Sequence, residues 1–154
     1  MKGNENVIES LNARLGEELT VINQYMVHAE MCGNWHYASL KKAIQGRAKV
    51  EMEHAEKLIA RIIFLEGRPA VSKLNDIHIG EDVPAMLKND NVAEQVAVQG
   101  YNESIRLAVE VGDNGTRELL SSLLTEEESH IDWIESQIDQ IARMQKENYL
   151  AEQV

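Results

Sequence analysis

An internal repeat constrains the fold of this 154-residue chain more than any other feature of its sequence. Glu18 and Glu51 stand 33 residues apart. Glu94 and Glu127 repeat this separation, each 76 residues after its counterpart. Apolar positions follow the same offset, and the pairs are Val7 with Val83, Leu11 with Leu87, Tyr25 with Tyr101, Leu58 with Ile134 and Ile62 with Ile138. Because a unit that recurs at a fixed offset is one supersecondary element used twice, we expect two copies of one structural unit.

Each unit contains two segments with the apolar periodicity of an α-helix. The sequence predicts four helices, at residues 5–34, 35–66, 83–111 and 116–145, followed by a short C-terminal helix. The low aromatic content of 5% and the presence of only two prolines also favour long helices over sheets.

Residues 68–82 show no helical period. Such a connection is long for a hairpin between packed helices, so we expect it to cross over along the bundle, with Asp82 as the N-cap of the next helix. Two helix pairs joined by one long connection describe a single all-α domain over residues 1–154, a ferritin-like four-helix bundle. The alternative, an ordinary up-and-down bundle, needs only short loops.

An acidic residue interrupts the middle of every predicted apolar face. The four are Glu18, Glu51, Glu94 and Glu127, and His54 and His130 each follow a glutamate by three residues, on the same helix face. With 26 acidic residues and five histidines, about one Glu-x-x-His pair is expected by chance. Chance does not explain why all six residues share the offset of the repeat.

Burying four carboxylates together would cost several kcal/mol per ion unless cations compensate them. Two glutamates plus two Glu-x-x-His pairs form the ligand set of di-iron carboxylate proteins. Mixed oxygen and imidazole donors suit iron or manganese, and the absence of thiolates argues against a structural zinc site. We therefore predict a catalytic di-iron centre held by these six residues, in preference to a solvated pattern of charges.

A second apolar stripe lies beside the predicted ligands. Met52 follows Glu51 and points about 100° away from it, in line with Ala48, Ala55 and Ile59. Leu19, Asn23 and Met26 form a matching stripe on the first predicted helix. These stripes predict contact with a second copy of the chain. Met52 is then either apolar filler or an axial thioether ligand of haem iron, and spacing alone does not decide between them.

The overall charge excludes several classes of partner. A formal net charge of −11 disfavours nucleic acid and anionic membranes as partners. The one cysteine, Cys32, cannot form an internal disulfide, which fits a reducing compartment. No stretch has the pattern of a signal peptide or the length of a membrane span, so we expect a cytoplasmic protein.

Four stretches closely resemble bacterioferritin, the haem-containing bacterial branch of the ferritin superfamily. They are "EELTVINQYMVHAEM", "VEMEHAEKLIARIIFLEGRP", "IGEDVPAML" and "EEESHIDWIESQIDQI". The resemblance implies ferroxidase activity, in which Fe²⁺ is oxidised by O₂ or H₂O₂, together with iron storage. It implies that Glu18 and His54 are terminal ligands of one iron, that Glu94 and His130 are terminal ligands of the other, and that Glu51 and Glu127 bridge the two.

The resemblance also implies an assembly and further cofactor contacts. Family members form a hollow homo-oligomer of 24 subunits built from dimers, which stores a ferric mineral and receives electrons from a ferredoxin-type reductant. Met52 and its symmetry mate would ligate one haem b between two subunits, beside Leu19, Asn23 and Met26. Tyr25 resembles a family tyrosine that supports electron transfer, and Trp133 matches a family position near the inner surface.

The chain departs from the family pattern at three positions. Gly46 and Val50 stand where familiar members carry a His and an Asp at an inner-surface iron site. Tyr101 replaces an apolar residue, and it is either a second redox-active phenol or a core tyrosine with a satisfied hydroxyl.

His28, His36 and His78 have no acid three residues before them, so we expect them at the surface or at a subunit contact.

Three other functions fit the sequence less well. A rubrerythrin-like di-iron peroxidase usually adds a cysteine-rich iron domain, which one cysteine cannot build. A DNA-protecting mini-ferritin would need a basic tail and ligands at the subunit interface. An iron-free interaction bundle leaves the shared offset of the six polar residues unexplained.

Overall fold

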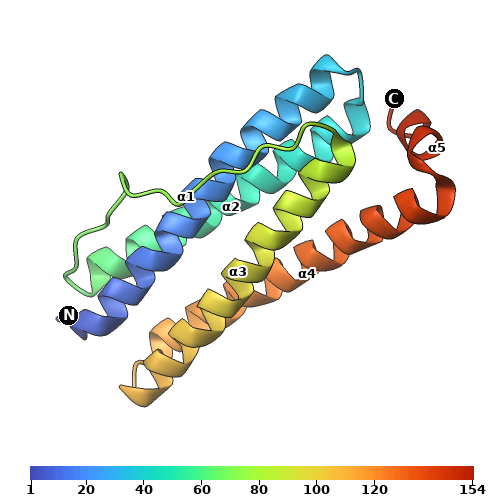
Figure 1. Cartoon of the computed structure of the whole chain (residues 1–154). Coiled ribbons are helices and arrows are strands. Elements are labelled where there is room, and N and C mark those ends of the chain that lie inside the picture. Colours follow the sequence, from blue (N-terminus) through green and yellow to red (C-terminus); the bar gives the residue numbers. More distant parts are fainter.

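The computed structural model describes residues 1–154, and its only regular secondary structure is α-helix (Figure 1). They are α1 (Glu5–Asn34), α2 (Ala38–Phe64), α3 (Val83–Glu110), α4 (Asn114–Met144) and the short α5 (Lys146–Ala151). The predicted all-α bundle with a short C-terminal helix is confirmed. The largest boundary difference is at α2, where residues 35–37 form a turn with His36 in the left-handed region at φ 65°.

Side chains before the first turn fix the start of several helices. The side chain of Asn4 accepts hydrogen bonds from the backbone N–H groups of Asn6 and Val7 at the start of α1. Asp82 accepts a hydrogen bond from the backbone N–H of Ala85, and a proline follows in the first turn of α3. These contacts satisfy N–H groups that have no partner within the helix, and they confirm Asp82 as the predicted N-cap.

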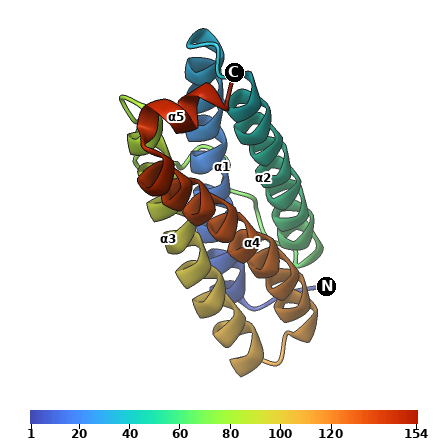
Figure 2. The same ribbon diagram turned by 90° about the vertical axis from the view of Figure 1, so that its right-hand side faces the viewer.

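The helices form two antiparallel pairs, α1 with α2 and α3 with α4, and the pairs meet where α1 packs against α3. Residues 65–82 contain no helix and run along the bundle past α1 to the start of α3 (Figure 1). Figure 2 shows the molecule from the side on which α2 and α4 lie. The connection is the predicted crossover.

Polar side chains of α1 hold the crossover in place along the bundle. Backbone N–H groups of the crossover donate hydrogen bonds to them, from Ala70 to Asn12, from Asn75 to Thr20, from His78 to Gln24 and from Gly80 to His28. The acceptors recur along one face of α1, as expected for positions three to four residues apart or multiples of that spacing. The extended chain is therefore fixed by side chains rather than by strand pairing.

One histidine prediction was wrong. His28 is fully buried, its Nε2 accepts the hydrogen bond from Gly80, and its Nδ1 lies 2.9 Å from Oδ1 of Asp90. Its partners come from α3 and the crossover rather than from an acid on its own helix, so local spacing gave no sign of them. His36 and His78 are exposed, as expected.

The apolar core is divided into two clusters by a polar layer. One cluster contains Val21, Tyr25, Leu40, Ile44, Leu87 and Ile134, and the other contains Leu11, Leu15, Leu58, Ile62, Leu120 and Leu123. On each long helix the residues between the clusters are the predicted metal ligands. Ile138 on α4 is exposed although its spacing predicted an inward position, whereas Ile141, one turn later, packs against the first cluster. No helix combines the length and apolar character needed to cross a membrane.

Candidate metal centre

The polar layer brings together all six predicted ligands, none of which is more than 8% exposed. Their donor atoms fall into two groups, each within 4.8 Å: Glu18, Glu51, His54 and Glu127, and Glu51, Glu94 and His130. Glu51 belongs to both groups. Each group contains one of the two terminal pairs that the resemblance implies, whereas Glu127, the second implied bridge, falls in the first group only. Whether these residues ligate metal stays a prediction.

The first group is centred on the imidazole of His54. Its Nδ1 lies 2.8 Å from Glu127, 3.1 Å from Glu51 and 3.6 Å from Glu18. The other ring nitrogen, Nε2, lies 3.0 Å from a carboxylate oxygen of Glu126 on α4. A carboxylate on the outer nitrogen fixes the orientation of an imidazole and directs its inner nitrogen at a metal. Glu126 was not among the predicted site residues, because a run of three acids on one helix resembles a solvated face.

The second group is enclosed by aromatic rings. Nδ1 of His130 lies 2.6 Å from Oε1 of Glu94. The ring of His130 stacks on that of Trp133, with ring centroids 6.0 Å apart, and is perpendicular to the ring of Tyr25, with centroids 5.6 Å apart. Tyr25 and Trp133, both carried over from the resemblance, therefore contact the same predicted ligand.

Two tyrosines link the helix pairs across the centre. The hydroxyl of Tyr25 on α1 donates to Glu94 on α3, and the hydroxyl of Tyr101 on α3 donates to Glu18 on α1. Both rings are fully buried. Tyr101 is thus a core tyrosine with a satisfied hydroxyl, one of the two interpretations that the sequence left open, and its acceptor is a predicted ligand.

Several donor and acceptor atoms at the centre lack a well-directed hydrogen bond. They are both carboxylate oxygens of Glu51, Oε1 of Glu127, Nδ1 of His54 and Nε of Arg47. The distances to charged neighbours are short, but the atoms do not point along hydrogen-bond directions. Buried polar atoms in native proteins nearly always have partners. Carboxylate oxygens and an imidazole nitrogen turned toward one space are a donor set that fits divalent iron.

The proton affinities of these groups are strongly shifted. Burial raises the pKa of Glu51 to about 8 and that of Glu127, which also hydrogen-bonds with Glu94, to about 9. Burial opposes ionisation of Glu94 as well, but hydrogen bonds with Glu127 and His130 outweigh it and lower its pKa. Burial alone would lower the pKa of His54, yet its carboxylate neighbours raise it to about 12. Since metal ligands must lose these protons, metal binding is coupled to proton release.

Arg47 is the one lysine or arginine that forms an ion pair with the four central glutamates. Its Nε lies 2.6 Å from Oε1 of Glu51, and its Nη2 donates a 2.9 Å hydrogen bond to Oε2 of Glu127. Burial lowers the pKa of Arg47, but Glu51, Glu94 and Glu127 raise it above its ordinary range. Sequence analysis missed this residue, although its i, i+4 spacing to Glu51 is a recognisable ion-pair signal.

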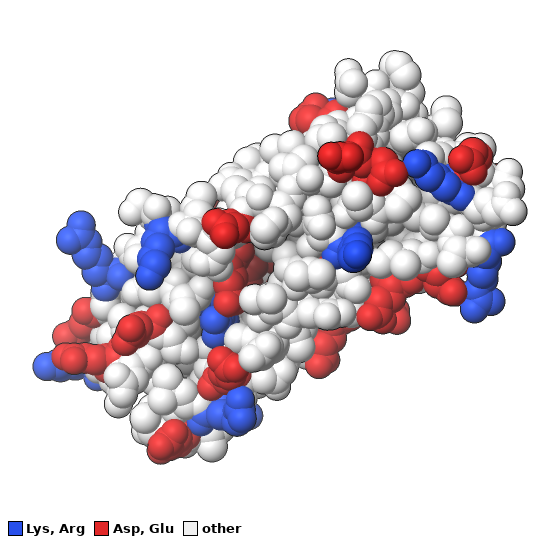
Figure 3. All heavy atoms as spheres, in the orientation of Figure 1, with Lys and Arg blue, Asp and Glu red and all other residues white.

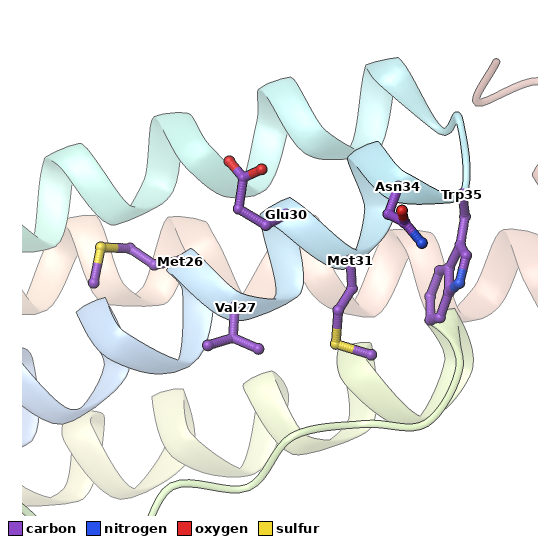
Figure 4. Close-up of a pocket in the computed structure, with 6 residues that line it drawn as sticks. All are labelled: Met26, Val27, Glu30, Met31, Asn34 and Trp35. Atoms are coloured by element: carbon purple, nitrogen blue, oxygen red, sulfur yellow. The ribbon is translucent and has the colours of Figure 1, made fainter.

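The residues predicted beside haem lie at the outer surface of α1 and α2. Met52 is 51% exposed and Met26 is 50% exposed, while Leu19 and Asn23 are half-buried. Met26 also borders a shallow, largely apolar groove, in which Val27, Met31 and Trp35 point toward the side of α3 and the crossover (Figure 4).

Over the face seen in Figure 3, basic side chains are scattered among acidic ones rather than gathered in a patch.

A four-helix bundle with a long crossover is the architecture of ferritin-like proteins, and its buried cluster of four glutamates and two histidines fits a di-metal carboxylate site. Comparison with known proteins agrees, since residues 8–144 match the family model described as the ferritin-like domain. The bacterioferritin of Rhodobacter capsulatus is 42% identical over 94% of this chain and 89% of that protein. The bacterioferritin of Brucella melitensis is 40% identical over 97% of this chain and 92% of that protein. A bacterial ferritin of Paramagnetospirillum magnetotacticum is also 40% identical, over 97% of this chain. The chain belongs to the ferritin family and, within it, to the bacterioferritins.

Proposed function

We propose that this protein oxidises Fe²⁺ with O₂ or H₂O₂ and stores the ferric product. The observation that supports this most directly is the set of buried, poorly partnered oxygens on Glu51 and Glu127, enclosed by carboxylates and imidazoles from all four long helices. Relatives named bacterioferritin support the same activity.

Each residue of the centre has a proposed role as a ligand of substrate iron. Glu18 and His54 hold one Fe²⁺, Glu94 and His130 hold the other, and Glu51 and Glu127 contact both. Four ionised glutamates balance the charge of two divalent ions, so the pair binds without leaving a buried net charge. Each ion gives up one electron to the oxidant.

The rest of the chain prepares the site for this chemistry. The two apolar clusters above and below the polar layer exclude bulk water from it. Tyr25 and Tyr101 hold the carboxylates of Glu94 and Glu18 by hydrogen bonds from opposite sides. Such fixed donors keep the ligands oriented before iron arrives. Tyr25 is also our proposed site of electron transfer.

An iron titration tests the proposal. Fe²⁺ added anaerobically and then mixed with oxidant should give a fast oxidation phase that saturates at about two ions per chain. Glu94→Ala should abolish that phase, whereas Glu103→Ala, which removes an exposed acid from the same helix, should preserve it. An unchanged fast phase in Glu94→Ala would contradict the proposed site.

We also propose that two copies of the chain hold one haem b between them. The donor chemistry fits, because the Met52 thioether is exposed on α2, and Met26 is exposed on α1, which packs against α2. Haem bound there would supply a route for electrons to the stored ferric iron. Dimers formed through this face would then assemble into a shell of about 24 subunits, as the family resemblance implies.

A further inference from the structure

Arg47 contacts the two glutamates that the proposed function shares between both iron ions. Its guanidinium spans Glu51 on its own helix and Glu127 on α4, and only 12% of its side chain is exposed. A guanidinium stays charged under all ordinary conditions. Arg47 therefore places a fixed positive charge against these two carboxyl groups and offsets part of the cost of burying them in ionised form.

Arg47 and a metal pair compete for the same atoms. The oxygens that Arg47 contacts are Oε1 of Glu51 and Oε2 of Glu127, and a carboxylate shared between two metals uses both of its oxygens. With both ions present, the glutamates are already neutralised, and a guanidinium at hydrogen-bond distance would face two divalent cations. The ion pairs of Arg47 and full metal occupancy therefore oppose each other.

Arg47 has room to move away. It lies on the side of the bundle formed by α2 and α4, where it also approaches the backbone carbonyl of Glu126 at 3.5 Å. The side chain of Arg47 is 12% exposed, so it reaches the solvent on this side. The side chain can therefore leave the two glutamates without displacing a helix.

We propose that Arg47 is a resident counter-cation of the centre, which stabilises the glutamates before metal binds and must leave when the second divalent ion enters. Arg47 thereby weakens the second binding step and makes filling of the centre sequential. The inference rests on the proposed function, since it requires the six residues to bind metal. It makes Arg47 a positioning residue rather than a ligand.

Zinc binding to the purified assembly tests this inference without any redox step. Arg47→Gln removes the charge but keeps a polar side chain, and the second Zn²⁺ should bind at least about tenfold tighter than in the wild type. The same variant, treated with chelator, should unfold at a temperature about 5 °C lower, because the glutamates have lost their counter-cation. The two effects have opposite signs, whereas a purely structural defect would weaken both folding and binding.

Arg61→Gln is the matched control. Arg61 is also on α2 and pairs with the start of α4, through the N-cap Asp113 at 2.8 Å and Thr116 at 2.9 Å, but it does not contact the centre. Its loss should lower the unfolding temperature and leave both zinc affinities unchanged. Arg47→Lys should give an intermediate zinc affinity, because an ammonium group cannot span two carboxylates as a guanidinium does.

The outcomes separate the two proposals. If the wild type binds about two Zn²⁺ per chain and Arg47→Gln binds the second with equal or lower affinity, the inference about Arg47 is wrong and the centre stands. If Arg47→Gln does not fold without metal, Arg47→Lys decides, and wild-type affinity in that variant overturns the inference. If the wild type binds no Zn²⁺ that depends on Glu94, the proposed function itself fails.

Discussion

The two halves of the repeat supply the same predicted ligands but surround them differently. At the offset of 76, Glu126 corresponds to Val50, Trp133 to Lys57 and Leu123 to Arg47. His54 therefore has a carboxylate on its outer nitrogen and a guanidinium beside its glutamates, whereas His130 lies against aromatic rings. Even the repeat partners Glu18 and Glu94 differ, because burial raises the pKa of Glu18, while hydrogen bonds lower that of Glu94 despite its burial. The two predicted metal positions are similar in composition and unequal in environment.

The outer faces of the two helix pairs differ as well. The stripe formed by Leu19, Asn23, Met26 and Met52 corresponds to Gln95, Gln99, Asn102 and Glu128 in the second pair, all four of them exposed. Only the first pair presents apolar side chains and a thioether there. Duplication explains the shared centre, and the differences indicate which surface each pair presents to other molecules.

The largest expected effect concerns this outer face. Met52→Leu should remove haem completely, because it deletes the proposed axial thioether, while Glu128→Leu at the corresponding position should leave haem unchanged. Absorption spectra of the reconstituted protein, with haem counted per pair of chains, would measure this. The wild type should show a low-spin spectrum with two thioether ligands. Spectra that do not respond to Met52 would reject it as the ligand.

The next effect concerns the outer partner of His54. Glu126→Gln removes the charge that orients this imidazole, so metal affinity in the first half should fall by about 10- to 100-fold. Co²⁺ titration followed by absorption would resolve the two binding steps. Glu128→Gln, on the neighbouring exposed acid of α4, is the control. If both steps weakened equally, the proposed difference between the halves would be wrong.

The smallest effect is a change of stability with pH. In the folded protein the pKa values of Glu51 and Glu127 are about 8 and about 9, above the pKa near 4.5 that a glutamate has in the unfolded chain. These groups therefore contribute their full stabilisation of the fold at pH values below about 4.5. That stabilisation is lost as pH rises through the folded values. Chelator-treated protein should therefore melt a few degrees lower at about pH 9 than at about pH 6.

With Zn²⁺ bound the trend should reverse, since the metal binds the deprotonated groups and its affinity rises with pH. Calorimetry with and without Zn²⁺ at both pH values would measure the two trends. Identical pH profiles in the two conditions would show that the central carboxyl groups are not coupled to metal.

The helices and the six central residues could be predicted because their signals are local or repeated. Apolar periodicity lies within each helix, and the offset of 76 identified Glu18 and Glu94 although neither has a nearby histidine in sequence. The contacts that distinguish the halves depend on how helices align with each other. The pairing of Arg47 with Glu127, of Glu126 with His54 and of His28 with Asp90 joins different elements, so no pattern within one helix reveals it.

The most direct test is anomalous diffraction at the iron absorption edge from crystals of the purified protein soaked in Fe²⁺. Two peaks per chain should lie in the layer between the two apolar clusters, one flanked by Glu18 and His54 and the other by Glu94 and His130. Glu51 should lie between the peaks. Iron found only at the surface, with the six side chains bonded to one another as before, would contradict the conclusion that these buried acids are arranged to bind a pair of cations.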